Sequence, residues 1–227
     1  MKTNTKGSKT YDVYRIIKRK IITLELRPGQ ALSERDLIQE LKVGRTPLRE
    51  AILMLKSEGL LESRPNESPY VKDITLKGVK DFFLPYLTLE KLVIRLAAQK
   101  MTSTLLREIK SINAEIDKAT KEKDSWNIMS KDRQLHSMIG RATDNEYVIQ
   151  IHEALLNQKE RLSYLAVSEE VQNGLPLQNH LEVSSRQHRE IISLLESNDV
   201  ENAETLAEEH VMSFQQRISM YISNPLL

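Results

Sequence analysis

From Thr75 onward, apolar residues recur at helical spacing, and no stretch shows the alternation of a half-buried strand. Short breaks separate the predicted helices, the longest at 173–180, and Pro85 is expected to kink or restart the first helix. Short connections make consecutive helices antiparallel, so that their apolar stripes pack together. We therefore predict an antiparallel α-helical bundle, with helices near residues 76–99, 103–122, 125–142, 145–171, 181–197 and 200–222.

The first 74 residues show a different pattern, in which short helices are followed by two short strands. An apolar stripe over residues 11–25 predicts the first helix, which Pro28 and Gly29 end. Ser33 has the side chain of a good N-cap and predicts the start of a second helix. That helix is followed by a tight turn at residues 42–44.

A third helix is predicted directly after this turn. Thr46 is expected to cap it, with Pro47 at its first position, where a missing N–H costs nothing. Residues 60–63 and 70–74 can then pair as a β-hairpin. Three helices and a hairpin, with a sharp turn between the second and third helices, are typical of a winged helix-turn-helix.

The sequence thus predicts a mainly α protein of two domains, an N-terminal winged helix-turn-helix over residues 1–74 and a C-terminal antiparallel α-helical bundle over residues 75–227. Charge is unevenly divided between them. Residues 1–72 hold 15 Lys and Arg against 9 Asp and Glu, whereas the rest of the chain holds 18 against 23. A basic N-terminal part indicates a polyanionic partner such as DNA, although an excess of this size can also simply be solvated.

Composition excludes several other classes of protein. The chain has no cysteine, which excludes disulfides and thiolate metal sites. No stretch approaches the roughly 18 consecutive apolar residues of a membrane span, and no apolar core follows the basic N-terminus as it would in a signal peptide. We therefore expect a cytoplasmic protein that has no membrane partner.

The predicted third helix has the residues of a DNA-recognition helix. Its apolar positions face the core, which leaves Arg45, Thr46 and Arg49 at its exposed N-terminal end. Guanidinium groups placed there can reach base edges or phosphates, and the helix N-terminus itself favours phosphate. Arg35, near the start of the second helix, is placed for a contact to the DNA backbone. The alternative is an ordinary solvent-facing helix start.

A candidate metal site lies in the predicted bundle. Asp132 and His136 are four residues apart, so both side chains leave the same face of a helix. His188 lies 11 residues before Asp199, where the chain turns, and His210 lies 11 residues after it. Residues equidistant from a turn sit at the same height in an antiparallel helix pair, so the two imidazoles can face each other.

Together these residues would supply three imidazoles and one carboxylate. Such ligands suit a divalent metal ion, with zinc, nickel or manganese preferred over calcium. Each histidine taken alone is more often an ordinary core or surface residue, and an exposed Asp132–His136 pair would be only a weak ion pair. His152 and His180 do not fit the pattern and are left out of the predicted site.

The run PGQALSERDLIQELKVGRTPLREAILMLKSEGLLESRPN resembles the DNA-binding domain of GntR-family bacterial transcription regulators. The resemblance implies that Arg35, Arg45, Thr46 and Arg49 are DNA-contacting residues. Two departures are present. Gly44 stands where the family usually has serine or threonine, and Glu67 in the wing would repel phosphate where many members carry a basic residue.

The helical region resembles the FCD effector domain of the FadR-type branch of that family. The marks are DRQLH at residues 132–136, Asn145 at the next helix start, and His188 and His210 on the last two helices. The resemblance implies that Asp132, His136, His188 and His210 hold a metal ion in a cavity that also receives a small effector, often an organic acid.

Tyr86 and Asn145 are expected to contact the effector. Many members carry an arginine at the position of Tyr86, where it helps to hold an acidic effector. The tyrosine therefore leaves open a neutral or differently held ligand.

The resulting hypothesis is a ligand-responsive transcription regulator, acting as a homodimer on a palindromic operator in double-stranded DNA. Effector binding in the bundle would alter the spacing of the DNA-binding domains through a hinge near residues 73–78. Two alternatives remain open at this point. One is a hydrolase-type metalloenzyme with an appended DNA-binding domain, and the other is a helical dimerisation module that binds no ligand.

Overall fold

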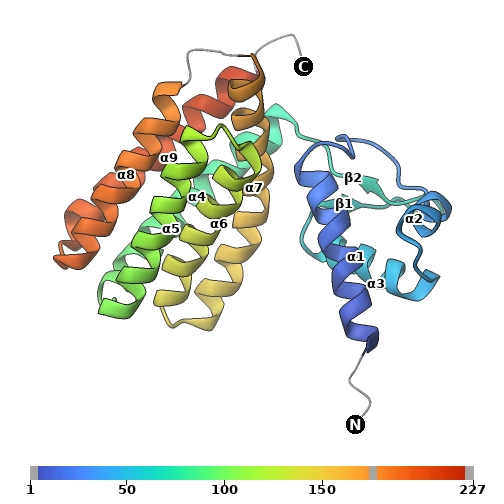
Figure 1. The fold of residues 1–227 in the computed structure, drawn as a ribbon, viewed down its shortest axis with the longest axis horizontal. Helices are drawn as coiled ribbons and strands as arrows, with labels where there is room; N and C mark the ends of the chain where they lie inside the picture. The colour runs from blue at the N-terminus through green and yellow to red at the C-terminus, as the bar shows by residue number, and fades with distance from the viewer. Residues whose placement is uncertain (1–4, 174–177, 223–227) are drawn as a thin grey trace. The chain divides into compact units, whose positions relative to one another are not determined.

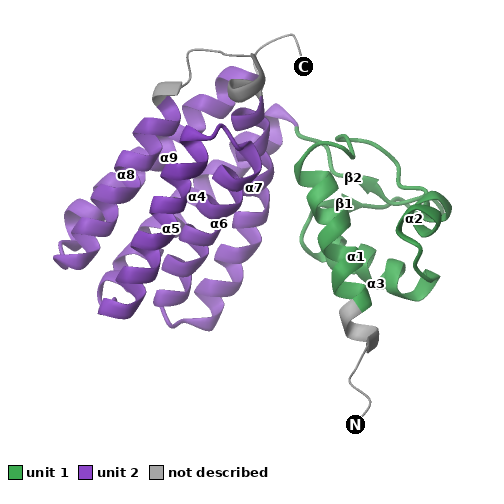
Figure 2. Ribbon diagram, viewed as in Figure 1, with its two compact units in different colours: residues 1–74 green, residues 75–227 purple. Residues whose placement is uncertain are grey.

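The computed structural model describes residues 5–173 and 178–222 (Figure 1). The chain divides into two compact units, residues 1–74 and 75–227, which are shown in separate colours in Figure 2. Within the described residues, no helix is long and apolar enough to cross a membrane.

Over its described residues, 5–74, the first unit contains three helices and one small sheet. Buried apolar side chains from all three helices form its core, among them Ile17, Leu37 and Leu55. The two strands are antiparallel, with Leu61 opposite Val71. The elements are α1 (Thr5–Ile22), α2 (Glu34–Leu41), α3 (Arg45–Ser57), β1 (Leu61–Glu62) and β2 (Tyr70–Val71).

The starts of α2 and α3 differ in how their backbone N–H groups are satisfied. Ser33 caps α2 as predicted, because its hydroxyl accepts a hydrogen bond from the N–H of Asp36. The predicted cap of α3 was wrong, since the N-cap is Gly44, which makes no side-chain cap bond. The helix can begin two residues earlier than expected because Pro47 is still in its first turn, where backbone N–H groups have no intrahelical acceptor.

The wing is a short hairpin closed by a tight turn. Its strands are shorter than the predicted 60–63 and 70–74. Asn66 has φ of 63°, and the N–H of Glu67 donates to the carbonyl of Arg64, as in a turn with proline at its second position. Ala31 forms a bridge to Tyr70, which ties the hairpin to the segment before α2.

The second unit is a bundle of helices, which lie alongside one another in Figure 1. Helix α4 continues through Pro85 without a restart. Part of the predicted break at 173–180, residues 174–177, falls outside the described residues. The helices are α4 (Leu76–Ala98), α5 (Ser103–Lys121), α6 (Ser125–Ala142), α7 (Glu146–Asn173), α8 (Gln178–Glu196) and α9 (Val200–Ile222).

The core of this bundle has an apolar part and a polar part. Helix α4 packs on α9, α5 on α6 and α8, and α6 on α7. The apolar part is one large cluster, to which α4, α5, α6, α8 and α9 all contribute. The polar part is unusual, because charged and imidazole side chains from α4, α6, α7, α8 and α9 are buried together.

Candidate functional site

Three histidines from three helices meet in the centre of the bundle. His136 of α6, His188 of α8 and His210 of α9 are each at most 6% exposed. One ring nitrogen from each lies within 4.8 Å of the corresponding atoms of the other two. The Nε2 atoms of His188 and His210 are 3.2 Å apart. The structure therefore brings together the two imidazoles that the spacing about Asp199 placed at one height.

Asp132 joins this group from the same helix as His136. Its Oδ1 atom lies 3.5 Å from Nε2 of His188 and 3.8 Å from Nε2 of His136. Its other oxygen, Oδ2, accepts a hydrogen bond from the ammonium group of Lys159 on α7. The side chain of Asp132 is 15% exposed, so the pair with His136 faces inward and is not a surface ion pair.

Two acceptors orient the imidazoles toward this cluster. Nδ1 of His136 lies 3.3 Å from the carboxylate of Glu90, and Nδ1 of His210 lies 3.1 Å from the amide oxygen of Gln187. An acceptor at Nδ1 favours the tautomer in which that nitrogen carries the proton. The Nε2 lone pairs of His136 and His210 are then left pointing into the cluster, as in metal-ligating histidines.

The pKa values of Asp132, His188 and His210 are all lowered, but by different causes. Burial alone would raise the pKa of Asp132, but the charge of Lys159 and the two imidazoles hold it well below its usual range. Burial lowers the pKa of His188 to about 3, partly opposed by Asp132. Burial, with His188 and His136 nearby, also lowers the pKa of His210. His188 and His210 are therefore neutral at pH 7, the form that binds metals.

The carboxylate of Glu90 contacts a second histidine through its other oxygen. Its Oε1 atom lies 2.8 Å from Nε2 of His152 on α7. Burial would raise the pKa of Glu90, but His136 and His152 together hold it well below its ordinary value. Close approach of His152 depends on Gly140 of α6, because a Cβ atom at Gly140 would lie 2.3 Å from Nδ1 of His152.

The geometry of the four predicted ligands fits a divalent metal ion. A cavity of about 10 Å³, room for one water-sized sphere, borders His136, His188 and His210 on the side of Glu90. Ligands about 2.1 Å from a tetrahedral zinc ion are about 3.4 Å from one another, close to the separations of His188 from His210 and Asp132. Nε2 of His136 is also buried and has no hydrogen-bond partner within the described residues.

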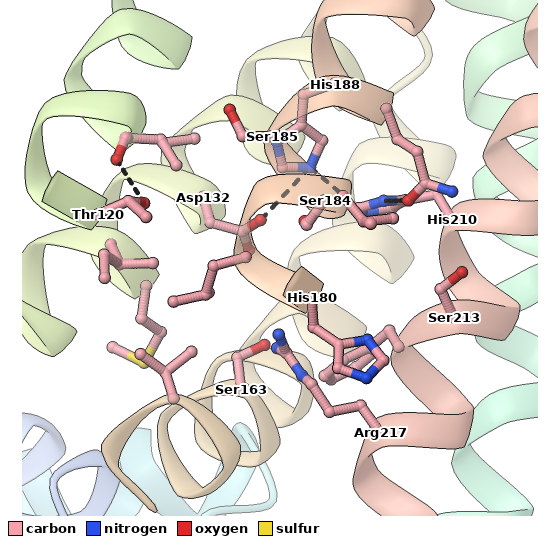
Figure 3. Close-up of a pocket in the computed structure, with 18 of the residues that line it drawn as sticks. Thr120, Asp132, Ser163, His180, Ser184, Ser185, His188, His210, Ser213 and Arg217 are labelled. Atoms are coloured by element: carbon pink, nitrogen blue, oxygen red, sulfur yellow. Dashed lines mark hydrogen bonds and ion pairs between the residues drawn. The ribbon is translucent and has the colours of Figure 1, made fainter. Parts of the chain in front are cut away.

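A larger cavity of about 40 Å³ opens beside the cluster. In the view of Figure 3, Asp132, His188 and His210 lie on one side of this cavity, and His180 and Arg217 lie on the other. Lys159 and Gln187 also line it, together with hydroxyl groups and apolar side chains that include Ser163, Ser184, Ser213, Met129, Val167 and Phe214.

The two predicted effector contacts, Tyr86 and Asn145, lie elsewhere. Neither is among the residues that line these two cavities. Tyr86 is fully buried against Phe82, and burial with Glu90 nearby raises its pKa well above the ordinary value. Asn145 is exposed, and its side-chain oxygen accepts from the N–H of Val148 at the start of α7. The role of Asn145 seen here is therefore that of a helix cap.

The predicted DNA-contacting residues cluster at the helix-turn-helix of the first unit. Arg35, Arg45, Thr46 and Arg49 are all exposed, at the N-terminal ends of α2 and α3. Nε of Arg49 donates to the carboxylate of Glu34 at 3.0 Å, which steers the guanidinium group while 63% of its side chain stays accessible. These ends can meet phosphate and base edges together.

The tip of the wing is less suited to phosphate. Glu67 is exposed and lies 3.8 Å from the guanidinium group of Arg64. It therefore offsets the charge of the basic residue nearest the turn. Gly44 supplies no hydroxyl at the N-cap of α3, which leaves the backbone N–H groups, Arg45 and Thr46 as the donors at this helix start.

Comparison with known proteins decides the family. Residues 9–71 match the bacterial regulatory proteins of the gntR family, and residues 86–213, more than half of the chain, match the FCD domain. The chain is an FCD-domain member of the GntR family. The first unit is thus its DNA-binding domain, and both the family resemblance and the mainly α fold class predicted from the sequence are confirmed.

Relatives of this GntR protein are named as regulators. It is 24% identical to the HTH-type transcriptional repressor RspR of Escherichia coli K12, over 91% of this chain and 87% of that protein. It is 25% identical to the Nta operon transcriptional regulator of Aminobacter aminovorans, over 72% of this chain and 76% of that protein. These names agree with a transcription regulator that is not an enzyme.

A solved structure shows the same fold. E. coli McbR/YncC superposes with a TM-score of 0.77 at 22% identity, covering 94% of this chain and 96% of that one. At this identity the likeness shows the fold of the regulator alone.

Sequence reasoning missed three residues at the FCD site: Glu90, His152 and Lys159. A signal for two of them was present, because His152 and Lys159 are seven residues apart, and Ser163 follows four residues later. That spacing places all three on one face of α7, which is the buried face. No local pattern indicated that Glu90, which stands between Leu89 and Lys91 in α4, would reach this site.

Proposed function

We propose that this GntR regulator binds a divalent metal ion and a small effector in its FCD domain, and that effector binding modulates its affinity for an operator. The observation that supports the proposal is the convergence of Nε2 of His136, His188 and His210 with Oδ1 of Asp132. Three buried imidazoles and a carboxylate gathered at one point form a costly polar cluster in a protein interior, and a bound metal ion would compensate that cost.

In this proposal Asp132, His136, His188 and His210 hold the ion, which zinc, nickel or manganese would satisfy. When bound, the ion offers a Lewis-acidic position to an oxygen atom of the effector. Glu90 and Gln187 keep the imidazoles of His136 and His210 oriented. The serine hydroxyls of the larger cavity provide hydrogen bonds, and its apolar side chains exclude water.

The DNA-binding unit is proposed to act as part of a homodimer in the cytoplasm. Two copies would present Arg35, Arg45, Thr46 and Arg49 to the two halves of a palindromic operator. The effector would shift the population of bundle conformations, and a hinge near residues 73–78 would transmit the shift to the DNA-binding units.

Metal analysis and operator binding test this function together. Wild-type protein purified without chelator should contain close to one equivalent of a transition metal, and His188→Ala should contain almost none. His180→Ala is the matched control, because His180 lines the larger cavity outside the histidine cluster. The proposal fails if the wild type binds none of the three metals when they are supplied, or if His188→Ala retains the metal of the wild type.

A further inference from the structure

Helix α4 carries a row of five exposed residues that is symmetric about its centre. Steps of three, four, four and three residues separate them, so they lie along one side of the helix. The central residue is a threonine, with a leucine four residues away and a charged residue seven residues away in each direction. The two charges are opposite in sign. This α4 row consists of Asp81, Leu84, Thr88, Leu92 and Arg95.

The α4 row complements itself when a second copy is laid against it in the opposite direction. A two-fold axis through Thr88 would place Leu84 opposite Leu92 of the partner subunit, and the reverse contact would form on the other side of the axis. The same operation would place Asp81 opposite Arg95 of the partner subunit. A parallel pairing would instead bring like charges together, which is repulsive.

The apolar residues of the row are unusually exposed. Leu84 is 73% exposed and Leu92 is 40% exposed. Single exposed leucines are ordinary on a protein surface, but apolar residues gathered in a patch indicate a contact site. Thr88 suits such a patch, because its hydroxyl donates to the carbonyl of Leu84 at 2.9 Å and is thereby satisfied within the helix.

Helix α7 extends this apolar surface. It packs against α4, where His152 of α7 hydrogen-bonds to Glu90, two residues before Leu92. Ile151, the residue before His152, is 55% exposed, and Tyr147, one turn earlier, is 77% exposed. The two helices together therefore present an apolar surface, as homodimer interfaces do.

The charged ends of the row can pair with a second copy while keeping their contacts within the chain. Arg95 has five N–H donors, and its bonds to Glu204 of α9 use two of them. The side chain of Asp81 is 62% exposed and pairs with Lys77, one turn away on the same helix. Exposed ion pairs add little affinity, but they fix the orientation and register of an interface.

The length of α4 agrees with a palindromic DNA site. The DNA-binding unit ends at Ile74, just before α4 begins at Leu76. Leu76 lies twelve residues before Thr88. In an antiparallel pair centred on Thr88 the two starts of α4 would therefore be about 36 Å apart along the helices, close to the roughly 34 to 36 Å between half-sites one turn apart on DNA.

We propose that the α4 row binds the α4 row of a second copy of this chain, antiparallel and with the two-fold axis at Thr88. This inference rests on the proposed homodimer and names its surface and register. Tyr147 and Ile151 lie at the edge of the interface and cover the leucines of the partner subunit.

Single cysteines can test the axis, because the chain has none of its own. Thr88→Cys should form a disulfide with its counterpart under mild oxidation, since facing helices about 8 to 10 Å apart bring Cα atoms at the crossing within disulfide reach. Thr205→Cys is the matched control. Thr205 of α9 is also exposed, and its hydroxyl also donates to the carbonyl four residues earlier, but it lies outside the α4 row. It should not cross-link.

Leu84→Cys and Leu92→Cys test the register. Each variant alone should cross-link poorly, because its two copies would be about 12 Å apart along the helix pair. A mixture of the two variants, after subunit exchange, should form the disulfide between residue 84 of one copy and residue 92 of the other. Mass spectrometry of the linked peptides identifies it. Efficient cross-linking of either variant with itself would contradict the register.

Leu84→Lys tests the affinity of the pairing. The dissociation constant of the dimer, measured by sedimentation, should rise about 100-fold or more, because one leucine is lost from each side of the interface. Leu53→Lys is the matched control, since Leu53 of α3 is 62% exposed and lies in the other unit. It should leave the dissociation constant unchanged. Both substitutions are at exposed positions, and circular dichroism checks that the variants are folded.

The outcomes separate this proposal from the homodimer on which it rests. A monomeric wild type would refute the homodimer itself. A dimeric wild type whose Thr88→Cys variant does not cross-link, or whose Leu84→Lys variant keeps the wild-type dissociation constant, would retain the homodimer and overturn the α4 pairing. Metal binding is measured independently and is unaffected by either result.

Discussion

The DNA-binding unit and the FCD bundle place their functional polar residues in opposite environments. Arg35, Arg45 and Arg49 lie in solvent at the ends of helices, where an unpaired charge costs little. His136, His188 and His210 lie in the protein interior, where each polar atom needs a partner. The first unit can therefore lose a functional side chain without losing stability, whereas the second cannot.

Removing the metal should have the largest effect on stability, and the loss should be confined to the bundle. A chelator that strips an ion present at about 1,000 times its dissociation constant lowers the free energy of unfolding by roughly 4 kcal/mol. Chemical unfolding with and without chelator measures this. Peptide amides of α3 should keep their hydrogen-exchange protection while those of α8 lose it. Equal losses of protection in α3 and α8 would show that the metal stabilises both units, contrary to this prediction.

Arg49→Ala should weaken operator binding without changing the stability of the protein. We expect a loss of operator affinity of about 100-fold in a dimer, because each Arg contact to a base edge contributes about 1 to 3 kcal/mol. The melting temperature should stay within about 2 °C of the wild type, since surface substitutions change stability little. Fluorescence anisotropy measures the operator affinity, and calorimetry measures the melting temperature. Arg107→Ala, an exposed arginine on α5, is the control, and unchanged affinity in Arg49→Ala would refute the recognition-helix assignment.

Acid should destabilise the metal-free bundle through its histidines. The pKa of His188 is 6.5 in a free side chain and about 3 in the folded protein. Between these values the unfolded chain binds more protons, so stability is full above pH 6.5 and falls as the pH drops toward 3. At pH 5 the loss from His188 alone is roughly 2 kcal/mol. Urea unfolding at pH 7 and pH 5 measures it, and equal stabilities would contradict the buried neutral imidazole.

Gly140→Ala should have the smallest effect of the four. The new Cβ would meet the ring of His152, and overpacking costs about 1 to 3 kcal/mol, partly offset by the better helix propensity of alanine. A net loss of about 1 kcal/mol is expected. In the His152→Ala background the same substitution should be neutral or stabilising. A loss of the same size in both backgrounds would show that His152 is not the obstacle.

The helical unit shows where prediction from the sequence stopped. The equal spacing of His188 and His210 about Asp199 needs only a helical hairpin, which is local, and the structure brings the two rings together. Glu90 reaches His136 from a helix 46 residues away, and Lys159 reaches Asp132 from another helix. Those contacts depend on how far each helix is rotated about its axis, which short-range spacing does not set.

By itself, the sequence determined the helical class, the family and the residues that one helix or one turn relates. Apolar periodicity, helix caps and the spacing of the recognition motif are local patterns, so they can be recognised in the sequence without knowledge of the packing. Tertiary structure decided which faces meet. It turned Asp132 inward toward Lys159, placed His152 behind Glu90, and left Asn145 outside the cavity as a helix cap. Burial then imposed the need for partners, because a charge or an imidazole removed from water is stable only beside a group that compensates it.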